Sequence, residues 1–126
     1  FEAPAPVMEP RDIRGAIALE QIDGKHRRAR VVRVAVHPDW RKKGVGKAMM
    51  EALCDYAFKK MGLHKLYLDV LEGNEPAIKL YESCGWKKVG ILRHHFIIGG
   101  MWANTILYEK IALCDFTQYT RPTEEA

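Results

Sequence analysis

The chain contains little cysteine and no long apolar run. Its 126 residues include three cysteines, and no pair has the Cys-x-x-Cys spacing. This usage argues against a disulfide scaffold or a zinc site and predicts reduced, mostly buried thiols at Cys54, Cys84 and Cys114. No apolar stretch approaches the roughly 20 residues that span a bilayer, and no basic start precedes an apolar segment as in a signal peptide. We therefore expect a cytoplasmic protein with no membrane partner.

Histidines in metal-ligand spacing are also lacking, since the five histidines form no His-Glu-x-x-His motif. We therefore expect no metal. Acidic residues are outnumbered, with 16 Asp and Glu against 20 Lys and Arg. The basic residues concentrate in Lys25–Arg33 and Arg41–Lys47. Such clusters suit a polyanionic ligand, whether a phosphorylated cofactor, a nucleic acid or a membrane surface, and a solvated basic face is the alternative. The absence of a recognised nucleic-acid reading motif argues against nucleic acid.

The composition that is present fits one globular domain over residues 1–126, because 48% of the residues are hydrophobic and 29% are charged. Residues 1–12 hold three prolines and predict an extended lead-in, and the polar residues 117–126 predict a fraying tail. Between them we expect strands at Ile13–Ile22 and Arg30–Val36, a helix at Val45–Met61, a strand at Lys65–Leu71, a helix from Asn74 to about Cys84, and strands at Ile91–Ile98 and Met101–Leu113.

Turn residues and periodicity refine these elements. Asp23-Gly24 predicts a tight hairpin turn, and Gly99-Gly100 predicts a second one. Gly62 stands where a left-handed residue would end the first helix. The spacing predicts an apolar face of that helix at Val45, Ala48, Met49, Ala52, Leu53, Tyr56 and Ala57.

The order of the elements predicts the fold class. Two helices inserted among strands predict an α/β (α+β) fold, in which a mixed sheet carries helices packed on it. The strands on either side of the Val45–Met61 helix should be parallel neighbours joined by a right-handed crossover.

The segment Arg41–Lys47 follows a predicted strand and opens a predicted helix. The first turn of a helix has backbone N–H groups without internal partners, and the helix dipole adds positive charge there. Gly44 and Gly46 carry no Cβ, so a pyrophosphate can approach the backbone. The spacing is neither a Walker loop nor a dinucleotide-binding motif. From this segment alone, a phosphate loop and a plain glycine turn with solvated charges are both open.

Two sequence blocks carry a resemblance to a known family. The first runs from Val34 through His37-Pro38-Asp39-Trp40 to the Arg-x-x-Gly-x-Gly of Arg41–Gly46. The second comprises Leu68-Asp69-Val70, Asn74, Ala77–Glu82 and Gly85-Trp86. In this order and spacing they resemble the GNAT superfamily of N-acetyltransferases, over roughly Ile13 to Ile111, with ribosomal-protein, polyamine and amino-sugar N-acetyltransferases as the similar groups.

The resemblance implies a mixed, mostly antiparallel twisted sheet of the acyl-CoA N-acyltransferase type and acetyl-CoA as co-substrate. It implies that the backbone of residues 42–47 and the Arg41 side chain hold the pyrophosphate, and that the edge of residues 34–36 pairs with the pantetheine arm. The cofactor-binding residues expected on this basis are Val34, Ala35, Val36, Arg41, Lys42, Lys43, Gly44, Val45, Gly46, Lys47 and Asn74. Asn74 is also expected to cap its helix.

The resemblance further implies that an amine attacks the thioester directly. Tyr81 matches the family tyrosine near the cofactor sulfur and is the candidate general acid, with simple packing on the sheet as the alternative. Asp69 lies twelve positions before Tyr81 and is the candidate general base. An ordinary strand-end carboxylate, or a water relay in its place, are the alternatives.

The chain departs from the family pattern at its start, because only residues 1–12 precede the first predicted strand, where family members usually have further elements that wall the acceptor site. The resemblance thus implies a fold shortened at the N-terminus. A homodimer is one source of the missing wall, because a second subunit could supply it. Two functions follow. The first is an N-acetyltransferase acting on a primary amine of a small molecule or a protein N-terminus, and the second is a non-catalytic acyl-CoA-binding or regulatory module.

Overall fold

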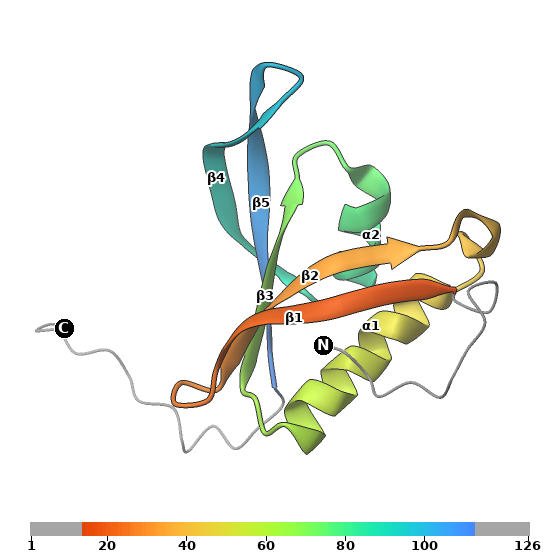
Figure 1. The fold of residues 1–126 in the computed structure, drawn as a ribbon, viewed down its shortest axis with the longest axis vertical. Coiled ribbons are helices and arrows are strands. Elements are labelled where there is room, and N and C mark those ends of the chain that lie inside the picture. Colours follow the sequence, from red (N-terminus) through yellow and green to blue (C-terminus); the bar gives the residue numbers. More distant parts are fainter. Residues whose placement is uncertain (1–13, 113–126) are drawn as a thin grey trace, which may run out of the picture.

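A computed structural model describes residues 14–112, so the predicted lead-in and tail lie outside the described residues. These residues include five strands and two α-helices, and Figure 1 shows how they are arranged. In chain order the elements are β1 (Gly15–Asp23), β2 (Arg28–Val36), the 3-10 turn η2 (Pro38–Trp40), α1 (Val45–Asp55), the π-helical turn η3 (Tyr56–Lys60), β3 (Lys65–Leu71), α2 (Glu75–Ser83), β4 (Lys87–Ile98) and β5 (Met101–Ile111).

The strands form one sheet in the order β1-β2-β3-β5-β4. Only β2 and β3 are parallel, and the other three pairs are antiparallel. The parallel pair flanks α1, because parallel neighbours need a crossover connection. The structure therefore confirms the predicted mixed, mostly antiparallel sheet and the predicted parallel neighbours.

Both helices pack on one face of this sheet. Along β3, Leu66, Leu68 and Val70 are buried and alternate with half-buried residues, as a strand with one covered face requires. The buried β3 residues belong to the same core cluster as Met50 of α1 and Tyr81 of α2. We call this side the helix face. The other side, which carries Tyr67 and Asp69 among other half-buried residues, we call the open face.

The predicted apolar face of α1 was partly wrong. Leu53 and Ala57 are buried as expected, but Ala48, Ala52 and Tyr56 are exposed. Met50 and Cys54 take their place in the core, so the buried positions are Met50, Leu53, Cys54 and Ala57. Small alanines are compatible with either side of a helix, so periodicity alone did not fix the rotation of α1 about its axis. Gly62 has the expected positive φ, +69°, after the helical segment ends.

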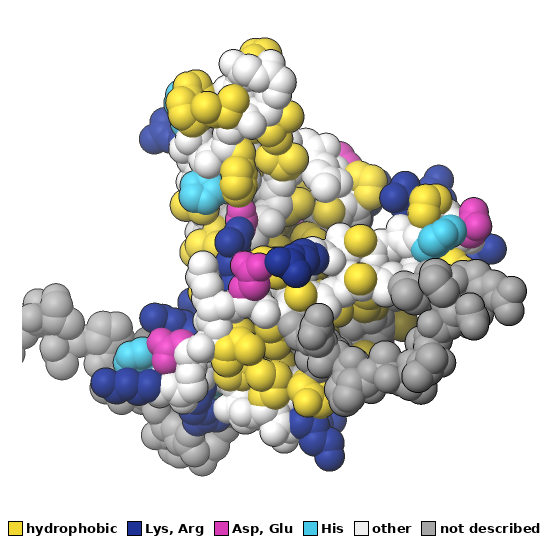
Figure 2. Space-filling model, in the orientation of Figure 1, with side chains coloured by type: hydrophobic (Ala, Val, Ile, Leu, Met, Phe, Trp, Pro, Cys, Tyr) yellow, Lys and Arg dark blue, Asp and Glu magenta, His cyan; other side chains and the backbone are white. Residues whose placement is uncertain are grey.

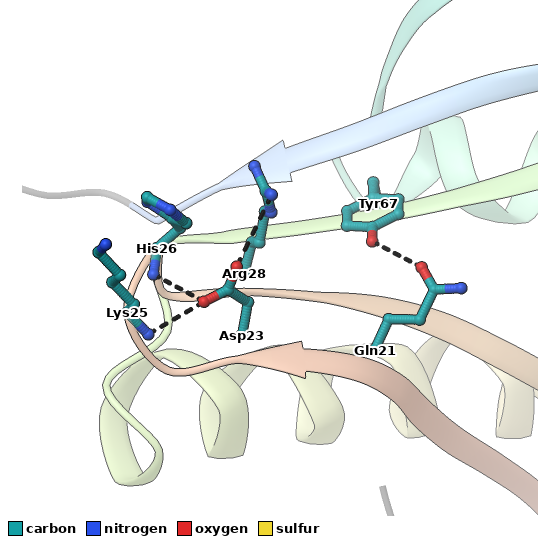
Figure 3. Close-up of polar contacts among 6 residues, drawn as sticks. All are labelled: Gln21, Asp23, Lys25, His26, Arg28 and Tyr67. Atoms are coloured by element: carbon teal, nitrogen blue, oxygen red, sulfur yellow. Dashed lines mark hydrogen bonds and ion pairs between the residues drawn. The ribbon is translucent and has the colours of Figure 1, made fainter.

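The β1–β2 hairpin is antiparallel, as expected, but its turn is longer than the tight turn predicted at Asp23-Gly24. Asp23 pairs with Arg28, so residues 24–27 make a four-residue connection. As Figure 3 shows, the Asp23 carboxylate accepts hydrogen bonds from the backbone N–H groups of Lys25 and His26, both at 3.0 Å. The positive φ falls on Arg27 and not on the glycine. The aspartate thus shapes the turn through its side chain, as in other Asx turns.

The second predicted hairpin turn is confirmed. Gly99 and Gly100 join β4 to β5 with φ of +57° and +77°, as a two-residue hairpin turn needs. The hairpin extends past the rest of the sheet, since β5 pairs with β3 only from Thr105 onward. Figure 1 shows this two-stranded part projecting from the molecule.

Candidate functional site

Strands β2 and β3 separate soon after they meet. They pair only from Arg28–Lys65 to Arg30–Tyr67, three residue pairs in all. Beyond them β2 continues to Val36, and Figure 1 shows the two strands diverging with α2 beside the gap. Arg33 has a φ of +55° where the β1–β2 register shifts, so the bend falls where the strands part. The edge of residues 34–36 that faces the gap therefore has no strand partner among the described residues.

The gap leads to the start of α1. Gly44 occupies the N-cap position with a φ of +79°, and no side chain caps the helix. The first turn of α1 holds no acidic residue. Its N–H groups are therefore available to an anion, and the helix dipole favours negative charge at this place. Arg41 lies beside it, where Nε donates to the Val36 carbonyl at 3.2 Å.

The two glycines of this loop are required for different reasons. A Cβ on Gly44 would meet nothing within 4 Å, but its left-handed backbone strains any other residue. Gly46 lies inside the helix, and a Cβ there would come within 3.2 Å of Leu80 Cδ2 and 3.6 Å of Val36 Cγ2. Gly46 therefore allows α1 to pack closely against α2 and β2. Sequence reasoning gave both glycines one role, the close approach of a pyrophosphate.

Tyr81 lies on the buried side of α2, only 6% exposed. Its ring centroid is 6.3 Å from those of Trp86 and Tyr108. The hydrogen bonds within residues 14–112 leave the Tyr81 hydroxyl unused. Burial raises the pKa of this phenol above its ordinary value, so it keeps its proton across the neutral range.

The hydroxyl of Tyr108, unlike that of Tyr81, has a hydrogen-bond partner. The Tyr108 hydroxyl donates to Glu82 Oε2 at 3.1 Å. Burial, followed by this hydrogen bond, raises the pKa of Tyr108. The two tyrosines thus share a buried site, and only Tyr108 has its hydroxyl committed to a structural bond within the described part of the chain.

Asp69 lies on the open face, so β3 separates it from Tyr81. Its carboxylate is largely buried and forms an ion pair with the Arg30 guanidinium. Arg30 is the last β2 residue that pairs with β3, and the ion pair therefore bridges the two strands where they begin to part. The sequence gave no indication of this contact, because 39 positions separate its partners.

Asn74 caps α2, as predicted, with Oδ1 accepting from the Ala77 N–H at 3.4 Å. Cys54 and Cys84 are free and buried, also as predicted, and burial raises the pKa of the Cys54 thiol. Cys114 lies outside the described residues. Within residues 14–112 no helix is long and apolar enough to cross a membrane, and no cluster of three metal-ligating side chains occurs.

The structure thus brings the two sequence blocks together at one gap. The model of the acetyltransferase (GNAT) family matches residues 3–86, which include both blocks. This chain belongs to the GNAT family. The match confirms the resemblance on which the predicted fold was based.

GNAT relatives of known activity differ in their acceptors. The chain is 36% identical over 92 residues to spermidine N(1)-acetyltransferase of Escherichia coli K12, covering 73% of this chain and 49% of the relative. It is 38% identical over 68 residues to the ribosomal protein bS18-alanine N-acetyltransferase of the same strain, covering 54% and 45%. The chain spans about half the length of the curated relatives it matches.

A solved GNAT structure supports the same fold. A mutant spermidine N-acetyltransferase from Vibrio cholerae superposes with a TM-score of 0.76 at 28% sequence identity. The match covers 83% of this chain and 62% of that chain.

Proposed function

We propose that this protein is an N-acetyltransferase that transfers an acetyl group from acetyl-CoA to a primary amine. The observation that carries the proposal is the parting of β2 from β3 directly beside the uncapped start of α1. An unpaired strand edge and a helix N-terminus together offer backbone hydrogen bonds to an amide-bearing arm and to a diphosphate. Membership of the GNAT family supports acetyl-CoA as the molecule that takes this place.

The residues for binding acetyl-CoA follow from this arrangement. The N–H groups of residues 42–47 bind the diphosphate, with the Arg41 side chain beside them. The free edge of residues 34–36 pairs with the pantetheine arm. Asn74 uses Oδ1 for its cap, so its Nδ2 group remains for a contact with the cofactor.

The thioester supplies an activated acetyl group, and the protein manages two protons. The amine nitrogen forms a bond to the thioester carbon while the carbon–sulfur bond breaks. Tyr81 donates its hydroxyl proton to the leaving sulfur, a role that suits a buried phenol with a raised pKa. The proton that the amine loses passes to water or to a carboxylate.

Asp69 is the carboxylate predicted from the sequence as the general base. Its ion pair with Arg30 occupies Oδ1, so Arg30 competes for the oxygen that would take the proton. We therefore propose that the main role of Asp69 is to hold β2 and β3 together where they begin to part. Asp69 could act as a base only through its second oxygen, Oδ2. Asp69 lies on the open face of the sheet and Tyr81 on the helix face. An amine that enters the gap from the open face would therefore approach the thioester from the side opposite to Tyr81, the proposed acid.

The acceptor is a primary amine of a small molecule or of a protein N-terminus. The relatives are named for spermidine and for a ribosomal-protein alanine, which are examples of both kinds. A solved relative is described as dodecameric, which supports association of this chain with further copies. A cytoplasmic location remains a prediction.

The test is release of free CoA thiol from acetyl-CoA across a panel of polyamines, amino sugars and peptides. The proposal expects amine-dependent release at a rate well above hydrolysis, with a matching mass gain of one acetyl group on one class of acceptor. Calorimetric binding of acetyl-CoA without acetylation of any amine would instead support the non-catalytic binding module. Absence of binding would overturn both.

A further inference from the structure

Several Lys and Arg side chains near the end of β2 form no ion pair with another residue of the described range, in contrast to three arginines of β2 itself. Arg28, Arg30 and Arg33 each contact a carboxylate of Asp23, Asp69 or Glu20. Within residues 14–112, no carboxylate lies within ion-pair distance of five basic residues near the start of α1, namely Arg14, Arg41, Lys42, Lys43 and Lys47. Figure 2 shows Lys and Arg side chains gathered around this end, at the right of the view.

Two of these cations are held on one aromatic ring. The Arg14 guanidinium carbon lies 4.1 Å from the centroid of the Trp40 ring, and Lys43 Nζ lies 5.3 Å from it. The Arg14 carbonyl accepts a hydrogen bond from the His37 N–H at 2.6 Å, which ties Arg14 to the end of β2. Stacking on an indole restrains a guanidinium while leaving its edge N–H donors free, and that edge matches a phosphate bidentately.

The charge at this end exceeds what a diphosphate alone requires. A diphosphate diester carries about two negative charges, and a phosphate monoester adds about 1.5 to 2 near pH 7. Coenzyme A carries both groups, because its ribose has a 3′-phosphate. The uncapped α1 amides and Arg41 serve the diphosphate. Arg14 and Lys43, which lie over the Trp40 ring, remain available for the 3′-phosphate.

We propose that Trp40 holds Arg14 and Lys43 as a clamp for the 3′-phosphate of coenzyme A, so that the protein discriminates against the cofactor that lacks this phosphate. The inference rests on the proposed binding of acetyl-CoA and adds specificity residues to that site. Trp40 is the positioning residue, and Arg14 and Lys43 are the residues that contact the phosphate.

The experiment compares the dissociation constants of CoA and 3′-dephospho-CoA by calorimetry at about 150 mM salt. The unmodified protein should bind CoA about 10-fold more tightly than dephospho-CoA, the scale of one charge-assisted hydrogen-bonded contact. Arg14→Gln should reduce this preference to about 2- to 3-fold while leaving the affinity for dephospho-CoA within about twofold. Trp40→Leu should reduce the preference in the same direction, because both cations lose their support.

Lys59→Gln provides the matched control, since Lys59 is an exposed cation in the segment after α1 and pairs with Asp55. It should change neither dissociation constant. Equal affinities of the unmodified protein for the two ligands, or an equal loss of both in Arg14→Gln, would overturn the clamp and leave the proposed function standing. Binding of neither ligand to the unmodified protein would overturn the proposed function and the clamp with it.

Discussion

Two buried tyrosines pack against each other in the core, and their hydroxyl groups have different surroundings. Tyr108 donates to Glu82, whereas the hydroxyl of Tyr81 is not used within the described part of the chain. The same Tyr→Phe change therefore removes a structural bond in one case and the proposed proton donor in the other. At the scale of single residues, comparing these two variants distinguishes an effect on the proposed catalysis from an effect on stability.

We expect Tyr81→Phe to lower turnover about 10- to 10³-fold with acetyl-CoA affinity preserved, because only the proton donor is lost. The raised pKa of Tyr81 means that ionisation should not reduce its activity as an acid until above about pH 10. Steady-state kinetics from pH 7 to 9 with calorimetric binding would check both points. As the matched control, Tyr108→Phe should lose about 0.5–1.5 kcal/mol of stability and keep its turnover. Unchanged turnover in Tyr81→Phe would show that another group is the acid.

The Arg30–Asp69 ion pair allows a second test at this scale. Asp69→Asn leaves a partly buried arginine without its counter-charge, so we expect a loss of about 1–3 kcal/mol in the free energy of unfolding. If Asp69 only holds the junction, Arg30→Gln should reduce turnover as much as Asp69→Asn does. A much larger loss for Asp69→Asn, with a changed acidic limb of the pH–rate profile, would establish Asp69 as the base. Denaturant titration and pH–rate profiles of both variants would separate the two roles.

At the scale of elements, the start of α1 combines two constraints that look alike in the sequence. Gly44 is required by its left-handed backbone, and Gly46 by the closeness of Leu80 on α2. An alanine at position 44 thus strains the N-cap of α1. An alanine at position 46 crowds Leu80 of the neighbouring helix α2, but it also raises the helix propensity of α1.

We therefore expect Gly44→Ala to cost about 1–2 kcal/mol of stability and to weaken acetyl-CoA binding several-fold, as the loop amides shift. Gly46→Ala should change stability less, because about 1 kcal/mol of helix propensity offsets the contact with Leu80. Its cost should shrink further in a Leu80→Ala background, where the space is free. Thermal unfolding and calorimetry would measure these effects. Loss of acetyl-CoA binding in Gly46→Ala with unchanged stability would instead show that Gly46 is needed for the close approach of the pyrophosphate.

At the scale of the whole molecule, the projecting part of the β4–β5 hairpin is the most apolar exposed region described. Ile97, Met101 and Trp102 are 61%, 73% and 60% exposed. A two-stranded ribbon beyond the edge of a sheet is only marginally stable by itself, and apolar residues on such a ribbon favour association. The predicted homodimer therefore has a physical reason in this hairpin.

We expect the protein to associate at tens of micromolar, and the double substitution Ile97→Lys with Trp102→Gln to yield monomer at the same concentration. Sedimentation velocity would measure the change. Ile22 on β1 is 53% exposed and offers a matched control, since Ile22→Lys should leave the association intact. A monomeric parent protein, or equal effects at both places, would contradict the role of the hairpin.

The sequence by itself determined the order of the elements, the strand Lys65–Leu71, the α2 cap at Asn74, the Gly99-Gly100 turn and the parallel pair around α1. These features depend on period, caps and turn residues within a few positions of each other, so local chemistry specifies them.

Only the tertiary structure decided which side of α1 is buried, where β2 leaves β3, and that Asp69 meets Arg30 across 39 positions. It also decided that Gly46 faces Leu80 and that Trp40 carries Arg14. Such contacts join segments that are distant in the chain, and no local pattern encodes the packing that brings them together.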